Sequence, residues 1–393
     1  MKKTHNKVQT HETALPGELI SSWESSIIES ARIRGTSRDA SHKEKLAAIV
    51  RAERSNVKSL WEAFTTDRQN LPRYLLDPKK QTASYLLGFH LPNCARAWNL
   101  LNRFDRRHGL SKEANNYSGI NIFDLGCGTG AVGQSLVSFL KHKKVKAPID
   151  VSLVDTQGPF LDATRLGFKN MGFEGQIRSK KARLEGCFDM VASQLKKDKL
   201  NIVVLGYVWN ELQNNPKAQR KFHEFAMEAS LYPTMFLVLE PANQHLARSA
   251  MELRDDMVMA GYKSLYPCIM SKPCPMLEKP KDWCYSETTW KLPKTISDLD
   301  RYLDLNRSKL KYAGYVLSSE MLAEKLAEIP EGEYTVVGRP TMQDKHTKKF
   351  DYKKDFEYLI CKGESLAKAP SNAAPKLLSR GTLLFDKKKP KKS

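Results

Sequence analysis

The sequence predicts an α/β fold built on a largely parallel β-sheet, preceded by a helical region. From about residue 118, short apolar runs alternate with longer amphipathic stretches, which is the pattern of βαβ units. A glycine-rich turn, Asp124-Leu-Gly-Cys-Gly-Thr-Gly130, directly follows the first of these runs. The chain has 393 residues, of which 41% are hydrophobic, and this is enough to fill an α/β core and a second, smaller unit.

Residues 1–115 are expected to be helical, because apolar side chains recur there at steps of three and four residues. Leu19, Ile20, Trp23 and Ile27 follow this spacing. At the other end, 364–393 is polar and rich in alanine, proline and lysine, as disordered tails are. We therefore expect five regions: a helical region (1–115), an α/β core (116–262), a cysteine-rich insertion (263–295), C-terminal strands that complete the sheet (296–363), and a basic disordered tail (364–393).

The expected strands of the core are apolar runs, and the stretches between them have helical periodicity. The predicted strands are Ile120–Asp124, Asp150–Asp155, Asn201–Tyr207 and Met235–Glu240, with later additions at Lys311–Leu317, Tyr334–Arg339 and Phe356–Cys361. The predicted helices of the core are Val132–Lys141, Gly158–Met171, Pro216–Ser230 and Asn243–Met259.

The glycine-rich turn suits a nucleoside cofactor. Gly126, Gly128 and Gly130 let the backbone turn tightly, approach a ligand closely and direct helix N–H groups at it. The run after a strand resembles the first motif of the class I S-adenosylmethionine methyltransferases, and its spacing differs from the GxGxxG of dinucleotide-binding folds. This resemblance implies a class I methyltransferase (Rossmann-like) fold for the core and S-adenosylmethionine as its cofactor.

An acidic residue ends the second predicted strand, at Leu153-Val154-Asp155. The methyltransferase family places an acid there to accept both ribose hydroxyls, and a carboxylate offers two acceptors to a diol. The alternative is that Asp155 only caps the next helix. The candidate cofactor-binding residues are Asp124, Gly126, Gly128, Gly130 and Asp155.

The catalytic residues and the methyl acceptor are not identified by the sequence. Many methyltransferases that modify the amino groups of bases carry Asn/Asp-Pro-Pro-Tyr/Phe after the fourth strand, whereas this chain has Trp209-Asn210-Glu211-Leu at that place. The cysteines expected of carbon-5 pyrimidine enzymes are absent from that strand. Transferase activity is therefore left open, and loss of activity with retained cofactor binding is one alternative.

The chain is strongly basic, with 64 Lys and Arg against 44 Asp and Glu and a formal charge of +20. Such a charge attracts polyanions, and nucleic acid first. The alternative is that the lysines form only a solvated surface. Two groups of lysines stand close together in sequence, namely Lys141, Lys143, Lys144 and Lys146, and Lys387, Lys388, Lys389, Lys391 and Lys392.

The sequence predicts an intracellular protein with no membrane partner. No stretch of about 18 apolar residues occurs, and Met1-Lys-Lys-Thr-His lacks the apolar core of a secretory signal. The early acids Glu12, Glu18 and Glu24 are unusual for a mitochondrial presequence. We expect a cytoplasmic location, with the mitochondrial matrix as the alternative, and the sequence leaves the oligomeric state open.

Three of the seven cysteines, Cys268, Cys274 and Cys284, crowd one proline-rich stretch with the spacing C-x5-C-x9-C. In a reducing compartment, such thiols point to a metal or a cluster more than to a disulfide. Cys361, at the end of a predicted strand, is the best candidate for a fourth ligand. Zinc and an iron–sulfur cluster would each accept four thiolates, and the spacing does not separate them. We expect Cys94, Cys127 and Cys187 to be small buried residues without a ligand role.

Beyond the glycine-rich turn, the chain carries Leu239-Glu240-Pro241, Leu253-Arg254-Asp255, Tyr266-Pro-Cys268, Cys274-Pro275, Asp282-Trp-Cys284 and a late Cys361. In this order they resemble the methyltransferase-like assembly factors of the small ribosomal subunit, the Rsm-type proteins of mitochondria and bacteria. The resemblance covers about 74–365. It departs from the family pattern at Ile269-Met-Ser-Lys272 and at Lys362-Gly363, where no thiolate is lost.

This resemblance implies association with the small ribosomal subunit during its maturation and binding to ribosomal RNA. It implies a [4Fe–4S] cluster on Cys268, Cys274, Cys284 and Cys361, beside the S-adenosylmethionine site. Two other functions stay open at this stage. One is an active S-adenosylmethionine-dependent methyltransferase acting on RNA, protein or a small molecule outside the ribosome, and the other is a checkpoint that leaves the ribosome when its cluster is lost.

Overall fold

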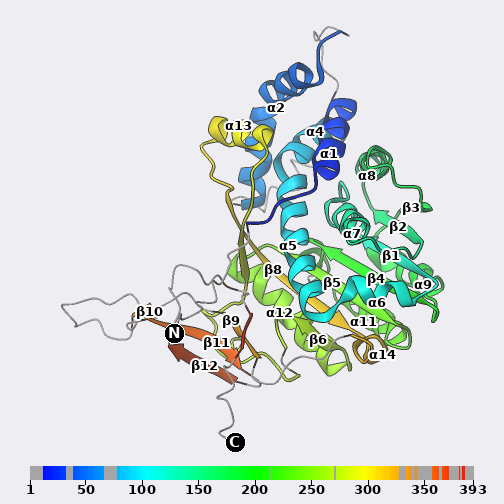
Figure 1. Cartoon of the computed structure of the whole chain (residues 1–393), viewed down its shortest axis with the longest axis vertical. Coiled ribbons are helices and arrows are strands. Elements are labelled where there is room, and N and C mark those ends of the chain that lie inside the picture. The colour runs from blue at the N-terminus through cyan, green and yellow to red at the C-terminus, as the bar shows by residue number, and fades with distance from the viewer. Residues whose placement is uncertain are drawn as a thin grey trace, which may run out of the picture.

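The computed structural model contains a region of helices, a large mixed β-sheet and a smaller second sheet (Figure 1). It describes residues 12–31, 39–65, 78–213, 215–269, 271–326, 333–337, 341–342, 356–362, 365–370, 380 and 383–385. The lysine group at 387–392 lies outside these residues, as do most of the tail and 338–340 of the predicted strand Tyr334–Arg339.

Most of the described part of the N-terminal region is helical, but residues 12–16 are not, and Thr13 forms an isolated β-bridge with Trp290. Its helices are α1 (Gly17–Ser30), α2 (His42–Thr65), α4 (Pro78–Tyr85), the π-helix η2 (Leu86–His90), α5 (Leu91–His108), α6 (Leu110–Glu113) and the 3₁₀ turn η3 (Ala114–Asn116). Two buried hydrogen bonds fix α1 in place. Trp23 Nε1 donates to the carbonyl of Leu86 (2.8 Å), and Ser22 Oγ donates to the carbonyl of Gly167 (2.8 Å) in the core.

The main sheet has the strand order β3-β2-β1-β4-β5-β8-β6, with β7 paired to β8. Neighbouring strands from β3 to β5 are parallel, while β8 runs antiparallel to β5, β6 and β7. The strands are β1 (Gly119–Leu125), β2 (Ile149–Asp155), β3 (Ile177–Lys181), β4 (Lys199–Gly206), β5 (Thr234–Glu240), β6 (Lys263–Tyr266), β7 (Ser286–Thr289) and β8 (Lys309–Ser318).

Helices cover both faces of the main sheet, because alternate side chains of its central strands point to opposite sides. Ile202 and Val204 of β4 join a core with α5, α7 (Ala131–His142) and α8 (Gly158–Asn170). Val203 and Leu205 join a second core with α9 (Phe188–Ala192), α11 (Pro216–Ala229) and α12 (Gln244–Met259). The remaining short helices are η4 (Leu184–Gly186), α10 (Trp209–Leu212), α13 (Lys294–Leu303) and α14 (Glu320–Ala323).

One strand was not predicted from the sequence, and one prediction about the late strands is wrong. β3 was not predicted, because it is an edge strand with four exposed side chains and no apolar run. The predicted strands near 334 and 356 do form, as β9 (Glu333–Val336) and β11 (Phe356–Lys362), but they do not complete the main sheet.

Instead, β9 and β11 belong to a second, antiparallel sheet with β10 (Thr341–Met342), β12 (Ser365–Pro370) and β13 (Leu383–Phe385). β12 and β13 fall within 364–393, so part of the predicted disordered tail is ordered. Only β8 of the three late runs joins the main sheet. Among the described residues, no helix is both long enough and apolar enough to cross a membrane.

A buried ion pair ties the helical region to the start of β8. Arg307 and Asp300 are 3% and 5% exposed and are in direct contact through Nε and Oδ1. Arg307 Nη1 also donates to the carbonyl of Gly88 (2.6 Å) in η2. One guanidinium therefore connects α13, β8 and the π-helix.

We predict that Asp300→Ala lowers the free energy of unfolding by about 3–5 kcal/mol, because it leaves a buried guanidinium without its carboxylate. Urea unfolding measures the change. Asp298→Ala on the same helix is the control, since Asp298 pairs with exposed Lys294 (3.0 Å) and costs less than about 1 kcal/mol. Equal losses in the two variants would contradict this account of Arg307.

Candidate functional site

The turn after β1 requires glycine at two of its positions. Gly126 has φ +70°, and a Cβ atom there would lie 2.5 Å from Cγ2 of Val208. Gly130 has φ +82°, and its Cβ would lie 2.5 Å from Cγ2 of Thr164. The left-handed backbone and the crowding explain why no larger residue fits. The turn then opens α7 at Ala131, so its free N–H groups face the same side as the strand end.

Two carboxylates hold this turn. Asp155 Oδ2 accepts the N–H of Gly128 (2.8 Å), and its Oδ1 accepts the N–H of Gln157 (2.8 Å). Asp124, only 1% exposed, accepts the N–H of Gly133 in α7 (3.2 Å). Gln157 is the residue before α8, so Asp155 does contact the helix start, as the capping interpretation expects. Its bond to Gly128 also joins β2 to the glycine-rich turn.

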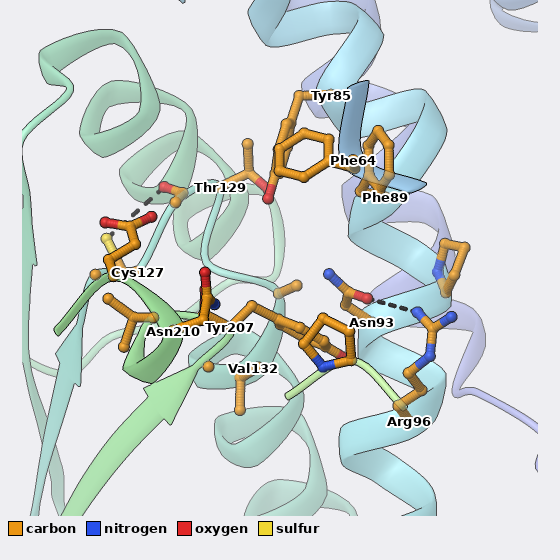
Figure 2. Close-up of a pocket in the computed structure, with 18 of the residues that line it drawn as sticks. Phe64, Tyr85, Phe89, Asn93, Arg96, Cys127, Thr129, Val132, Tyr207 and Asn210 are labelled. Atoms are coloured by element: carbon orange, nitrogen blue, oxygen red, sulfur yellow. Dashed lines mark hydrogen bonds between the residues drawn. The ribbon is translucent and has the colours of Figure 1, made fainter. Parts of the chain in front are cut away.

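A cavity of about 1240 Å³ opens at this edge of the sheet, over the carboxyl ends of β1, β2, β4 and β5 (Figure 2). In open α/β sheets, ligands bind at this end of the strands. Asp124, Gly126, Gly128 and Asp155 all line the cavity, so four of the five predicted cofactor-binding residues meet there. Gly130 is not among the lining residues and acts through the shape of the turn.

The roof of the cavity comes from the N-terminal helices, and the sequence did not predict this. Phe64, Tyr85 and Phe89 lie on α2, α4 and η2, above the glycine-rich turn (Figure 2). Their rings form one cluster, with centroids 4.9 Å apart for Phe64–Phe89 and 5.2 Å for Tyr85–Phe89. Tyr85 also contacts Phe160 of α8 (5.1 Å). The only sequence pattern that could have indicated this roof is the helical spacing of its aromatic side chains. Aromatic residues with that spacing more often pack in a hydrophobic core than line a cavity.

The floor of the cavity is formed after β4. Tyr207 has φ +65°, which is unusual for a residue with a side chain and turns the chain sharply at the strand end. Burial raises the pKa of Tyr207 to about 12, while the nearby Arg96 acts in the opposite direction. Glu240, fully buried at the end of β5, accepts the N–H of Trp209 (2.8 Å) and so fixes the start of α10.

The cysteine-rich loop lies between β6 and β7 and is held by side chains of α12. Arg248 donates to three of its carbonyls, at Leu277 (3.0 Å), Lys279 (2.9 Å) and Asp282 (2.7 Å). The carbonyl groups of an irregular loop have no hydrogen-bond partners in a helix or sheet. The bonds from Arg248 supply such partners and therefore fix the conformation of the loop.

Further along α12, Asp255 Oδ2 accepts the N–H of Cys274 (2.7 Å), and Arg254 donates to the carbonyl of Lys272 (2.6 Å). The two side chains also pair with each other at 2.6 Å, and Arg254 is only 1% exposed. The Leu253-Arg254-Asp255 motif thus positions the loop beside its second cysteine.

The four predicted metal-binding cysteines gather in one region. Cys274 and Cys361 belong to the same buried apolar cluster, and Cys268 and Cys284 pack against it. Burial, and then repulsion between neighbouring thiolates, raise the pKa of Cys274 to about 11 and that of Cys284 to about 12. The same causes raise the pKa of Cys361. Within the described residues, however, no three or more His, Cys, Asp or Glu side chains are placed to hold a metal ion.

Two arginines face this region. The charge of Cys268 raises the pKa of Arg254 against the lowering effect of burial. Arg380 lowers the pKa of Cys284 by its charge and stacks on Tyr285, with its Cζ 4.0 Å from the ring centroid. A nearby cation favours the thiolate, the form that binds metals, but burial outweighs this effect, since the pKa values of Cys274 and Cys284 are raised. Four sulfur atoms are a donor set that zinc and iron–sulfur clusters accept, so the residue types fit such a group.

One hydrogen bond joins the cysteine-rich loop to the cavity. Trp283 Nε1 donates to the carbonyl of Ala242 (2.9 Å), and Ala242 lines the cavity at the end of β5. The other three cysteines are buried, as predicted: Cys94 and Cys187 are 0% exposed and Cys127 is 8% exposed.

Residues 109–348, more than half of the chain, match the model of a protein family described as mitochondrial small ribosomal subunit Rsm22. No curated protein matches the chain. Several solved structures are similar at low identity and low structural overlap.

A protein of Listeria monocytogenes, described as an inferred class I S-adenosylmethionine-dependent methyltransferase, is 13% identical, with a TM-score of 0.36 over 77% of this chain and 88% of that one. An inferred RNA methyltransferase of Pyrococcus horikoshii is 14% identical, with a TM-score of 0.31 over 57% and 82% of the two chains. An S-adenosylmethionine-dependent O-methyltransferase of Thermotoga maritima is 12% identical, with a TM-score of 0.30 over 54% and 63%. Methyltransferases are thus among the structures similar to this chain, while its mixed α/β fold is given by its own strands and helices.

We predict that Asp124 makes stability fall as the pH rises from about 4 to about 7. Burial raises the pKa of Asp124 to about 7, so in this range the folded chain binds a proton that the unfolded chain, with a carboxyl pKa of about 3.9, releases. The contribution reaches at most about 4 kcal/mol. Asp124→Asn keeps an acceptor for Gly133 but does not titrate. Chemical unfolding of both proteins across this range should show wild type losing stability relative to the variant, and a constant difference would contradict the prediction.

Proposed function

The chain belongs to the family of the mitochondrial small ribosomal subunit protein Rsm22, and from this premise we propose that it is a methyltransferase-like protein that binds ribosomal RNA and aids assembly of the small ribosomal subunit. The observation that carries the proposal is the family match itself, which includes the glycine-rich turn, most of the cavity-lining residues and three of the four clustered cysteines. The mitochondrial description of the family favours the matrix over the cytoplasm as the location.

S-adenosylmethionine is the proposed cofactor, bound in the cavity within a class I methyltransferase fold. Asp155 keeps a second lone pair on each carboxylate oxygen, so it can accept two ribose hydroxyls while it holds Gly128 and Gln157. Gly126 and Gly128 bring backbone close to the ligand. When bound, the cofactor supplies a transferable methyl group, and the chain's own contribution is to orient it and limit its contact with water.

We further propose that Cys268, Cys274, Cys284 and Cys361 bind a [4Fe–4S] cluster, with zinc as the alternative. Four thiols from one loop and one distant strand, with Arg254 and Arg380 beside them, support this set. Such a cluster carries net negative charge with four thiolates, and two arginines offset it. The bound group would join β11 of the second sheet to the loop on α12.

An exposed basic strand supports the RNA-binding part of the proposal. β3 is the edge of the main sheet, and its Arg178, Lys180 and Lys181 are exposed. The next residues, Ala182 and Arg183, line the cavity. A phosphate backbone along β3 would therefore lead directly to the cavity. Among the lysines at the end of α7 and just after it, Lys143 pairs with Asp105 (2.9 Å), while Lys141, Lys144 and Lys146 are exposed and form a second candidate contact surface.

A second candidate function is an active methyltransferase that acts on RNA, protein or a small molecule outside the ribosome. The size of the cavity supports this function, because there is room for a substrate beside the cofactor. Incubation with methyl-labelled cofactor, immature small subunits and soluble protein separates the two. Label in soluble protein alone would support the second function over the first.

We predict that Cys361→Ser loses the cluster. Anaerobically purified wild type should contain roughly four iron atoms per chain with the visible absorption of an iron–sulfur cluster, and the variant should lose most of both. Cys187→Ser is the matched control, because Cys187 is equally buried but lies in η4–α9, away from the other thiols. Stoichiometric zinc without iron in wild type would overturn the cluster, and an unchanged iron content in Cys361→Ser would overturn its fourth ligand.

We predict that Lys180→Glu/Lys181→Glu weakens binding to a small-subunit rRNA fragment and lowers the slope of log K against log salt by about 2, since two phosphate contacts are lost. Lys294→Glu/Arg301→Glu is the control. It makes the same charge change on α13, which lies beside α2 and away from β3 (Figure 1). Filter binding at several salt concentrations measures both, and equal losses would reject β3 as the contact surface.

A further inference from the structure

The cavity divides into two parts of opposite charge. On the side of the glycine-rich turn and η4 its acids are Asp124, Asp155, Glu185 and Glu211, with Arg183 as the one cation among the described lining residues there. On the side of α5 and the start of β8, its charged groups are Arg96, Arg307, Lys309 and Lys311. Arg307 pairs with Asp300, and Lys309 and Lys311 share Glu287, so these four cations exceed their two carboxylate partners by two charges. Figure 2 shows Cys127 and Thr129 at one side, and Asn93 and Arg96 at the other. At about 1240 Å³ the cavity exceeds the volume that one drug-sized ligand fills. The basic part is therefore room for a second ligand beside the proposed cofactor.

Asn210 lies on the floor between these parts, and the protein fixes the orientation of its amide. Nδ2 donates one hydrogen to the carbonyl of Tyr207 (3.0 Å) and the other to Oε2 of Glu240 (2.9 Å). Glu240 is 0% exposed, and its Oε1 is held by the N–H of Trp209 (2.8 Å). A carboxylate accepts hydrogen bonds and donates none, so the amide nitrogen of Asn210 must face Glu240.

The consequence is a single hydrogen-bond acceptor presented to the cavity. Both hydrogens of Nδ2 are used, and Oδ1 has no partner in the described part of the chain. An amide that could rotate would accept or donate equally well. Held by Glu240, Asn210 can only accept, and a ligand with an N–H group at this point is favoured over one with a carbonyl oxygen.

The surroundings indicate which N–H donor fits. The rings of Phe64, Tyr85 and Phe89 form the facing roof (Figure 2), and aromatic rings bind nucleobases by stacking. Arg96 is oriented by Asn93 Oδ1 (2.6 Å) and by the carbonyl of Lys311 (3.1 Å) at the basic side. A guanidinium in this position suits a phosphate. A flat ring, an amino group and a phosphate are together the chemistry of a nucleotide.

We propose that the basic part of the cavity selects a nucleobase with an amino group at the ring position where uracil and guanine carry a carbonyl oxygen, namely cytosine or adenine, and that Asn210 is the residue that determines this specificity. Glu240 is the positioning residue that keeps the Asn210 oxygen facing the ligand. The inference deepens the proposed function, on which it rests, by naming the class of base that enters the cavity. It also gives the Leu239-Glu240-Pro241 motif a physical role.

Calorimetric titration with CMP and UMP tests the specificity directly, because the two differ at the ring position where one carries an amino group and the other a carbonyl oxygen. Each titration is made with and without S-adenosylhomocysteine. We expect wild type to bind CMP about tenfold more tightly than UMP, as the gain or loss of one buried hydrogen bond implies. AMP and IMP form a second such pair and should show the same preference.

Two variants locate the effect. Asn210→Leu, of similar size, should bind CMP and UMP about equally, while Asn115→Leu, an exposed position outside the cavity, should keep the preference. Glu240→Gln has the same shape but can donate to Asn210, so the preference should shrink or invert. Cooperative urea unfolding verifies that each variant is folded.

The outcomes separate this inference from the proposed function. Equal binding of CMP and UMP by wild type, no binding of either at millimolar concentration, or an unchanged preference in Asn210→Leu would overturn the inference. A preference for CMP in a protein that does not bind S-adenosylhomocysteine would reject the proposed cofactor and leave the inference standing.

Discussion

A charge removed from water must find a partner within the protein, and in this chain the partners join segments that lie far apart in sequence. Arg307 meets Asp300 and the carbonyl of Gly88, which fixes the helical region against the start of β8. Arg254 and Asp255 of α12 meet the cysteine-rich loop. The carboxylate of Glu240 orders the floor of the cavity. The helical roof, the sheet and the cysteine-rich loop are therefore positioned by buried polar contacts as well as by apolar packing.

The central strands were predictable because they are buried on both faces of the sheet and therefore consist largely of apolar residues. β1, β2, β4 and β5 are apolar runs, and the structure places each within one or two residues of its predicted bounds. β3 could not be found in this way, since Arg178, Lys180 and Lys181 point into solvent at the sheet edge. The strands near 334 and 356 were predicted, but an apolar run does not indicate to which sheet a strand belongs. β12 and β13 form in a segment whose composition is typical of disorder.

The site was predictable only in the part that one local motif specifies. Gly126, Gly128 and Asp155 carry the constraints of a tight turn near a ligand, and those constraints are visible in the sequence. The aromatic roof lies up to about 60 residues before the turn, and Glu240 reaches Asn210 across two neighbouring strands. Such contacts depend on the tertiary arrangement and leave no local pattern. Cys361 was chosen as the fourth ligand because it ends a predicted strand, and the family resemblance implied the same set, whereas spacing alone cannot place residues 77 positions apart.

Helix α12 serves both sites, and this has a consequence for how the family can evolve. Ala242 and Asn243, immediately before its first turn, line the cavity, while Arg248, Arg254 and Asp255 hold the cysteine-rich loop. Successive residues of an α-helix lie about 1.5 Å apart along its axis and are rotated by about 100° around it. Inserting or deleting one residue between 243 and 254 would swing Arg254 and Asp255 away from the loop. Surface loops can change length during evolution, but this segment should keep a constant number of residues. We therefore expect its length to be conserved more strictly than its side chains.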